Sequence, residues 1–181
     1  MKKFSEIFLN KNESYESCIF DQCGLGSRFV DSVNIYSSVF SEADLSFSDF
    51  EDATIKDSQF ETCDVNGVKI IRGVLDTVNF LKCKMEKFST ENSNLKKVNI
   101  IESSANSSKF KISKINNSIF FKTSLADSSF QNSTLENVQF KNCDLTGTSF
   151  FNTEMKAVIF RDCKMDGVEL SKEQKKGSTI E

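Results

Sequence analysis

The stretch ADLSFSDFEDATIKDSQF (residues 43–60) repeats one five-residue pattern without interruption. Each unit has a small residue, a polar residue, a large apolar residue and two further residues that are mostly polar. Ala43, Asp44 and Leu45 open the first unit. Positions two apart share one face of a β-strand, because side chains alternate along it. Each unit therefore predicts a short strand whose small and large apolar residues both point inward.

The same period runs from Phe20 to Leu170. Of the 31 residues whose number is a multiple of five, 30 are apolar, against about 12 expected from a hydrophobic content of 38%; Thr90 is the exception. Two residues before these centres, 29 of 31 residues are small, and Arg28 and Phe88 are the exceptions. An α-helix would spread a period of five around all its sides. The pattern therefore predicts a coil with a corner every five residues.

Phenylalanine is sorted along the chain with a period of twenty. Eleven centres are Phe, of which seven belong to one series, four to the series displaced by ten and none to the two series between them. This sorting predicts four sides and twenty residues per coil, about eight coils in all, with a rod length of ~37 Å at ~4.8 Å per coil. Around residues 73–105, Phe88 and Thr90 weaken the pattern, so we expect a bulge or a bend there without loss of register.

Several units carry a family resemblance. Ala43-Asp-Leu-Ser-Phe, Ser128-Ser-Phe-Gln-Asn and Cys143-Asp-Leu-Thr-Gly resemble the pentapeptide-repeat consensus Ala-Asp/Asn-Leu-x-x, and the resemblance covers residues 15–170. It implies an all-β fold, a right-handed quadrilateral parallel β-helix with four pentapeptides per coil. It also implies a binding protein, because some members, among them quinolone-resistance proteins, are understood to protect type II topoisomerases by imitating DNA.

The two ends of the chain lie outside the repeat. Residues 1–14 are expected to form an N-terminal cap, with Phe4, Ile7 and Phe8 spaced as on a helix face, and residues 171–181 a polar C-terminal tail. Related quinolone-resistance proteins dimerise through an apolar C-terminal segment, from which this tail departs. The first residues resemble a signal peptide, but Glu6 and Asn10 interrupt the apolar stretch and no cleavage site follows. No apolar run reaches the ~18 residues of a membrane span. We expect a cytoplasmic protein.

The residues that chemistry usually needs are scarce. The chain has no His, no Gly-rich phosphate loop and no Gly-x-Ser-x-Gly motif. All six cysteines occupy the small inward position, which would stack Cys63 on Cys83 and Cys143 on Cys163. A metal or redox role is the alternative to simple core filling, and core filling is favoured because no His assists and no Cys-x2-Cys spacing occurs. We expect no enzyme, no cofactor and no metal.

Charge is segregated along the chain, whose net charge is −3. Residues 21–67 hold ten acidic residues against Arg28 and Lys56, and residues 68–125 hold eleven bases against four acids. The acidic band is a candidate DNA mimic for DNA gyrase or topoisomerase IV, and its proposed surface residues are Asp44, Asp49, Glu51, Asp52, Asp57, Glu61 and Asp64. The basic band departs from a duplex mimic. Acidic and basic bands that stack rods against each other, or plain solvated surface, are the alternatives.

Two further surfaces are predicted. One position after the centres of one face, Leu81, Ile101 and Phe121 would form an outward apolar stripe with Ile119 nearby. Contiguous apolar surface often marks an interface, so this stripe is the candidate contact site for a protein partner or a homodimer. Nucleic-acid binding is a weaker alternative, because stacking aromatic residues are lacking among the lysines that would carry it, which are Lys82, Lys84, Lys87, Lys96, Lys97, Lys109 and Lys111.

Overall fold

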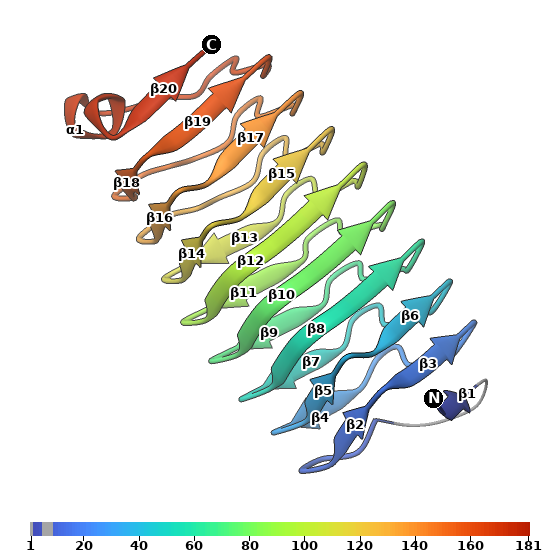
Figure 1. The fold of residues 1–181 in the computed structure, drawn as a ribbon. Helices are drawn as coiled ribbons and strands as arrows, with labels where there is room; N and C mark the ends of the chain where they lie inside the picture. Colours follow the sequence, from blue (N-terminus) through green and yellow to red (C-terminus); the bar gives the residue numbers. More distant parts are fainter. Residues whose placement is uncertain (1, 5–8) are drawn as a thin grey trace.

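The computed structural model describes residues 2–4 and 9–181, and it forms a parallel β-solenoid of about nine turns (Figure 1). Every fifth residue from Asn12 to Gly167 has a positive φ, which turns the chain through one corner. Strand partners lie twenty residues apart, as in the pair Phe20 and Phe40. The predicted period of five and the predicted four-sided coil of twenty residues are therefore confirmed.

The four sides of the coil are named here by their inward centres. Face A is centred on Phe20 and every twentieth residue after it, face B on the series of Leu25, face C on the series of Val30 and face D on the series of Tyr15. These centres are buried from Tyr15 to Phe150.

Face A is a ladder of ten strands, and the long strands β8, β10 and β12 also run through the corner from face D. In spatial order the strands are β1 (Lys2–Phe4), β3 (Cys18–Asp21), β6 (Val39–Ser41), β8 (Thr54–Glu61), β10 (Val74–Leu81), β12 (Asn94–Ile101), β15 (Ile119–Phe121), β17 (Gln139–Lys141), β19 (Val158–Arg161) and β20 (Ser178–Ile180). All neighbouring pairs on this face are parallel.

The other faces have shorter pairings. Face D adds β2 (Ser14–Glu16), β5 (Asn34–Tyr36), β14 (Lys114–Asn116), β16 (Thr134–Glu136) and β18 (Glu154–Lys156). Face C holds β4 (Phe29–Asp31), β7 (Asp49–Glu51), β9 (Lys69–Ile71), β11 (Ser89–Glu91) and β13 (Lys109–Lys111). Face B is joined by single bridges from Gly24–Asp44 to Asp144–Lys164.

Two stacks of phenylalanine rings fill the core. On face A the rings of Phe20 and Phe40 are parallel, with centroids 4.4 Å apart. On face C, Phe110 and Phe130 stack at 4.9 Å. The two stacks meet edge to face across the interior, for example Phe110 on Phe120 at 5.7 Å and 84°. Stacked and edge-to-face rings are the favoured aromatic geometries, so the Phe sorting of the sequence specifies the packing of opposite faces.

The small residues two positions before each centre form what we call the small inward column. Their hydroxyl groups make hydrogen bonds to backbone groups, in addition to the hydrogen bonds of the strand ladders. The Ser38 hydroxyl donates to the Tyr36 carbonyl at 2.7 Å and accepts the backbone N–H of Cys18 at 3.1 Å. Ser58 repeats both contacts one coil later. Among the described residues, no buried side-chain nitrogen or oxygen is without a partner. Ser and Thr are therefore tolerated in this core because each hydroxyl satisfies inward backbone groups.

The region around Phe88 keeps its register. Strand β11 pairs residue for residue with β9 and with β13, so that Ser89 lies between Lys69 and Lys109. The expected bulge is therefore absent from the described strands of this region.

The ends of the chain extend the solenoid beyond the predicted array. Strand β1 pairs with β3, so a strand stands where the spacing of Phe4 suggested a helix, and Ile7 and Phe8 lie outside the described residues. Residues 171–181 form helix α1 (Lys172–Lys176) and strand β20, which pairs with β19. These additions explain why about nine turns replace the expected eight.

Helix α1 closes the last coil through one side chain. Gln174 is buried, and its amide donates to the carbonyls of Phe150 at 2.6 Å and Thr153 at 2.9 Å. Ser171 caps the helix by accepting the Gln174 N–H, and the Gln174 side chain accepts the Ser171 N–H. A Cβ at Gly177 would lie 2.0 Å from the Met155 carbonyl, so the chain passes this point only as glycine.

Candidate binding surfaces

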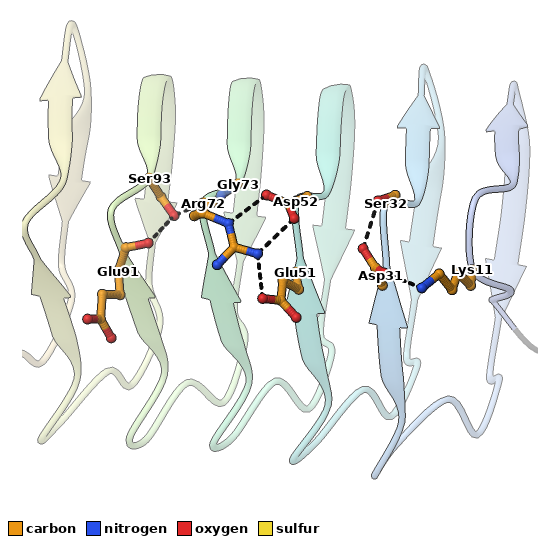
Figure 2. A network of polar contacts seen from close by, with 9 residues as sticks. All are labelled: Lys11, Asp31, Ser32, Glu51, Asp52, Arg72, Gly73, Glu91 and Ser93. Carbon is orange, nitrogen blue, oxygen red and sulfur yellow. Dashed lines mark hydrogen bonds and ion pairs between the residues drawn. The ribbon is translucent and has the colours of Figure 1, made fainter.

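The seven predicted acidic residues divide into paired and unpaired carboxylates. Arg72 bridges Glu51 and Asp52 from the following coil (Figure 2). The Lys69 ammonium lies 3.2 Å from the Asp49 carboxylate. The hydrogen bond from Arg72 lowers the pKa of Asp52, and the two carboxylates raise the pKa of Arg72. Lys69 thus offsets Asp49, and the single charge of Arg72 is shared between Glu51 and Asp52. These pairings weaken the use of the three carboxylates as phosphate mimics.

The unpaired carboxylates gather at the corner between faces A and B. Asp44 and Asp64 are bridge partners on neighbouring coils, and each accepts the backbone N–H of the residue two positions on, at 2.9 and 3.0 Å. Glu61 ends β8 on face A, and Glu42 occupies the corner position. We call Glu42, Asp44, Glu61 and Asp64 the acidic edge. None of the four has an ion pair within residues 2–4 and 9–181, and Lys84 ends this edge on the next coil.

Asp57 lies apart from the acidic edge. It occupies a corner between faces D and A with φ +49°, and it is exposed. The structure therefore brings Asp44, Glu61 and Asp64 together, leaves Asp57 at another corner and pairs the remaining three. The sequence prediction did not include Glu42, although its place two residues before Asp44 was a usable signal.

The predicted apolar stripe is contiguous. Leu81 pairs with Ile101, and Ile101 pairs with Phe121, on strands β10, β12 and β15. Ile119 lies on the same outer side of β15, and all four side chains are half-buried. The Lys122 ammonium lies 5.2 Å from the centre of the Phe121 ring, a cation–π distance. We keep the name apolar stripe for Leu81, Ile101, Ile119 and Phe121.

Other apolar side chains are more exposed than the stripe. They are Phe29, Phe47, Ile112, Phe151 and Ile180. Phe47 covers Gly67 on the next coil, where a Cβ would lie 2.7 Å from the ring. Ile112 is a β-branched residue at a corner with φ +51°. Positive φ is costly for such a residue, so its corner is locally strained.

The C-terminal end carries two adjoining hollows. One of about 730 Å³ is bounded by Phe151, Met155 and Leu170 together with helix α1, and one of about 560 Å³ by Met165, Val168 and Ile180. Leu170, Met165 and Val168 are only partly buried. The last coil therefore presents apolar groups that a further coil would have covered.

The cysteine thiols behave as members of the small inward column. Cys63, Cys83 and Cys143 donate to the carbonyls of Phe40, Phe60 and Phe120 at 3.3–3.5 Å, the contact that Thr123 makes to Ile100. All six are free thiols, and Cys163 is half-buried. Among residues 2–4 and 9–181, no group of three or more His, Cys, Asp and Glu residues could hold a metal ion.

Comparison with known proteins identifies the family. Family models for a pentapeptide repeat region and for pentapeptide repeats in eight copies match residues 14–90 and 123–162. The chain belongs to the pentapeptide-repeat family.

Solved structures share the fold. A trypsin-treated form of QnrB1, a plasmid-mediated fluoroquinolone resistance protein, has a TM-score of 0.71 at 11% identity, covering 99% of this chain and 91% of that chain. A second trypsin-treated form has a TM-score of 0.62 at 10% identity, with coverages of 93% and 91%. HetL, involved in heterocyst differentiation regulation in a Nostoc cyanobacterium, has a TM-score of 0.44 at 15% identity, with coverages of 98% and 90%. No curated protein sequence matches the chain. Likeness at these identities shows the fold alone.

Helices contribute little to the described structure. Within it, no helix has the length and apolar character needed to cross a membrane.

Proposed function

We propose that this pentapeptide-repeat protein acts by binding rather than by catalysis, and that its partner contacts the acidic edge and the adjoining outer side of face A. The observation that carries this proposal is the contiguity of the two surfaces. Glu61 pairs with Leu81 in the β8–β10 ladder, so the acidic edge leads directly into the apolar stripe. A charged rim beside a desolvated apolar centre is the usual composition of a protein interface.

The first candidate partner is DNA gyrase or topoisomerase IV, which would be protected or inhibited through DNA mimicry. Support comes from the unpaired carboxylates of Asp44 and Asp64, which project from adjacent coils of a regular ladder. The fold likeness to a fluoroquinolone resistance protein favours the same partner. Lys84 limits the acidic edge to a few coils, so the contact would cover only a short segment of a duplex-binding groove.

The test is a supercoiling assay of gyrase, with and without a quinolone, in the presence of the purified protein. Asp44→Asn together with Asp64→Asn removes two charges, and an asparagine oxygen can still accept the turn hydrogen bonds. We expect this double variant to lose inhibition or drug protection at least tenfold. The matched control, Asp49→Asn with Asp52→Asn, removes two charges that are already paired and should change the effect much less. Equal losses in both variants would contradict mimicry by the acidic edge.

The second candidate is a structural or effector scaffold that binds a protein through the apolar stripe. The half-buried contact of Leu81, Ile101 and Phe121 on three consecutive coils favours it. Replacing these three residues together by Ser should abolish the partner complex while thermal unfolding of the rod stays cooperative. A complex that survives this replacement would contradict the scaffold hypothesis.

A further inference from the structure

The outer side of face A consists of two columns of side chains. The leading column directly precedes each centre, and the trailing column directly follows it. From the coil of Phe20 to that of Phe160, the trailing column holds Asp21, Ser41, Glu61, Leu81, Ile101, Phe121, Lys141 and Arg161. Glu181 follows Arg161 at the end of β20 and is paired with it. Next to the three apolar residues, acidic Glu61 thus stands on one side and basic Lys141 on the other.

The two charges next to the apolar centre have no partner within their own chain. Among the described residues, Glu61 has no ion pair and accepts only from the Gln59 amide at 3.3 Å, and Lys141 has no ion pair. The charges farther out are satisfied, because Asp21 pairs with Lys3 and Arg161 pairs with Glu181. Glu61 and Lys141 are each one coil from the apolar centre.

We propose that the surface formed by face A binds a second copy of this chain, with the two rods antiparallel and their face A surfaces opposed. The two-fold axis lies in the interface, runs along the strand direction and passes beside Ile101. This inference rests on the binding role proposed above for the apolar stripe and names its partner. In a two-fold interface the same patch must complement itself, and the order of the trailing column meets that condition.

The operation matches the trailing column residue by residue. Ile101 meets Ile101 of the second copy, and Leu81 meets Phe121 of the second copy. Glu61 then meets Lys141 of the second copy, once on each side of the axis. The register is fixed by charge, because a shift of one coil would place a charged residue against the apolar centre, where desolvation disfavours it.

The leading column fits the same axis in most of its pairs. Asn99 meets Asn99 of the second copy, and Asn79 faces Ile119 of the second copy while its amide oxygen accepts from Asn99 of its own chain at 2.8 Å. Gln59 meets Gln139 of the second copy, two side chains that can exchange hydrogen bonds. Val39 meets Ile159 of the second copy, which adds apolar contact away from the centre. The corner lysines Lys82, Lys97 and Lys122 lie exposed at the rims of the face, where solvent and salt screen their like charges.

The size of face A sets the expected strength. At ~4.8 Å per strand and ~3.3 Å per residue, the opposed surfaces would cover roughly 500 Å² per copy. The dimer would bury on the order of 1,000 Å², the lower bound for a specific interface. We therefore expect a dimer that dissociates in the micromolar range.

The test uses sedimentation equilibrium of the full chain across a micromolar concentration series. The wild-type mass should rise from 20.4 kDa towards twice that value. Glu61→Lys alone and Lys141→Glu alone should each raise the dissociation constant at least tenfold. An equimolar mixture of the two variants should form a heterodimer of wild-type strength, because each lysine then meets a glutamate at both contacts. The double variant E61K/K141E should also dimerise.

Controls separate this interface from the other surfaces. Ile180→Ser, at the open C-terminal end, should leave the dissociation constant unchanged. A wild-type mass that stays at 20.4 kDa, a mixture that stays monomeric, or a loss of self-association on Ile180→Ser would each overturn the proposal. Far-ultraviolet circular dichroism of each variant verifies folding. The gyrase assay uses Asp44 and Asp64, which are outside this interface, so failure of the dimer and failure of the proposed function give different results.

Discussion

Phe88 and Thr90 reverse the usual order of side-chain sizes. In most other coils the position of Phe88 holds a small residue and the position of Thr90 holds a large apolar residue. Phe88 occupies the small inward column and Thr90 the centre, and each is 1% exposed. The Phe88 ring lies 5.8 Å from that of Phe80 and 6.0 Å from that of Phe110. It therefore fills, from the neighbouring position, the space that a face C centre fills elsewhere. The exchange keeps the volume of the coil and explains why β11 stays in register.

A double-mutant cycle tests this exchange. Phe88→Ser should cost about 3–5 kcal/mol through the cavity it leaves, and Thr90→Phe should cost about 1–3 kcal/mol through overpacking. The double variant restores the usual order and should cost much less than the sum. Equilibrium urea unfolding measures all three changes in free energy. Additive changes would show that the two sites do not share one volume.

Replacing Ile112 at its corner should increase the stability of the chain. Asn adopts positive φ more readily than a β-branched residue, and the Ile112 side chain is 52% exposed. Ile112→Asn is therefore expected to stabilise the chain by about 1 kcal/mol. Asn132, one coil on in the same column with φ +58°, is the matched control, and Asn132→Ile should destabilise by a similar amount. Thermal unfolding of both variants measures these changes in stability. A destabilised Ile112→Asn variant would mean that the side-chain contacts of Ile112 outweigh its backbone strain.

Gln174 should determine how firmly the last coil closes. Gln174→Glu keeps the shape but loses the amide donors, so the carbonyls of Phe150 and Thr153 lose their partner. We expect a loss of about 1–3 kcal/mol, since buried acceptors become unsatisfied. Hydrogen exchange should become faster in β18 and β20 and remain unchanged in β8. The neighbouring exposed substitution Glu173→Gln serves as control, and equal effects from both would refute the closing role.

Cys163 should be the first thiol to react. A hydrogen bond with the Cys143 thiol lowers the pKa of Cys163 to about 7 and raises the pKa of Cys143. The thiolate is the nucleophile, and a lowered pKa places it in the neutral range. Alkylation of the folded protein by iodoacetamide should therefore modify Cys163 with a pH–rate midpoint near 7. Cys143→Ala, which removes the hydrogen-bond donor, should move that midpoint towards 9.0, the ordinary value. An unchanged midpoint would assign the reactivity to exposure alone.

The repeat itself could be predicted from sequence because one physical demand recurs in every unit. In every unit one side chain, such as that of Phe40, must point into the core and the next, such as that of Ser41, must point outward. The five-residue period is therefore visible along the whole sequence. The ion pairs of Lys69 and Arg72 were also legible in principle, since their partners Asp49 and Asp52 lie twenty residues earlier. Counting the net charge over long segments of the chain concealed these ion pairs. Of the seven predicted acidic residues, Asp49, Glu51 and Asp52 are paired, Asp44, Glu61 and Asp64 belong to the acidic edge, and Asp57 lies at another corner.

The closing segment was harder to predict because it follows a different rule. Residues 171–181 are polar in composition, and Lys175 breaks the apolar series. Ile180 nevertheless falls twenty residues after Phe160 and pairs with it. The role of Gln174 depends on carbonyls left open by the end of a coil, which no periodic pattern specifies. Such contacts arise where the repeat stops.

The fixed step of twenty between strand partners limits how such a chain can change length during evolution. Gain or loss of a whole coil moves later residues along the rod and keeps every one on its side. Gain or loss of five residues instead rotates everything after it by a quarter turn. Glu61 and Lys141 share one column because eighty residues between them add up to four whole coils. Any inherited insertion between these two positions that is taken into the coil, and is not a multiple of twenty, would carry them to different sides.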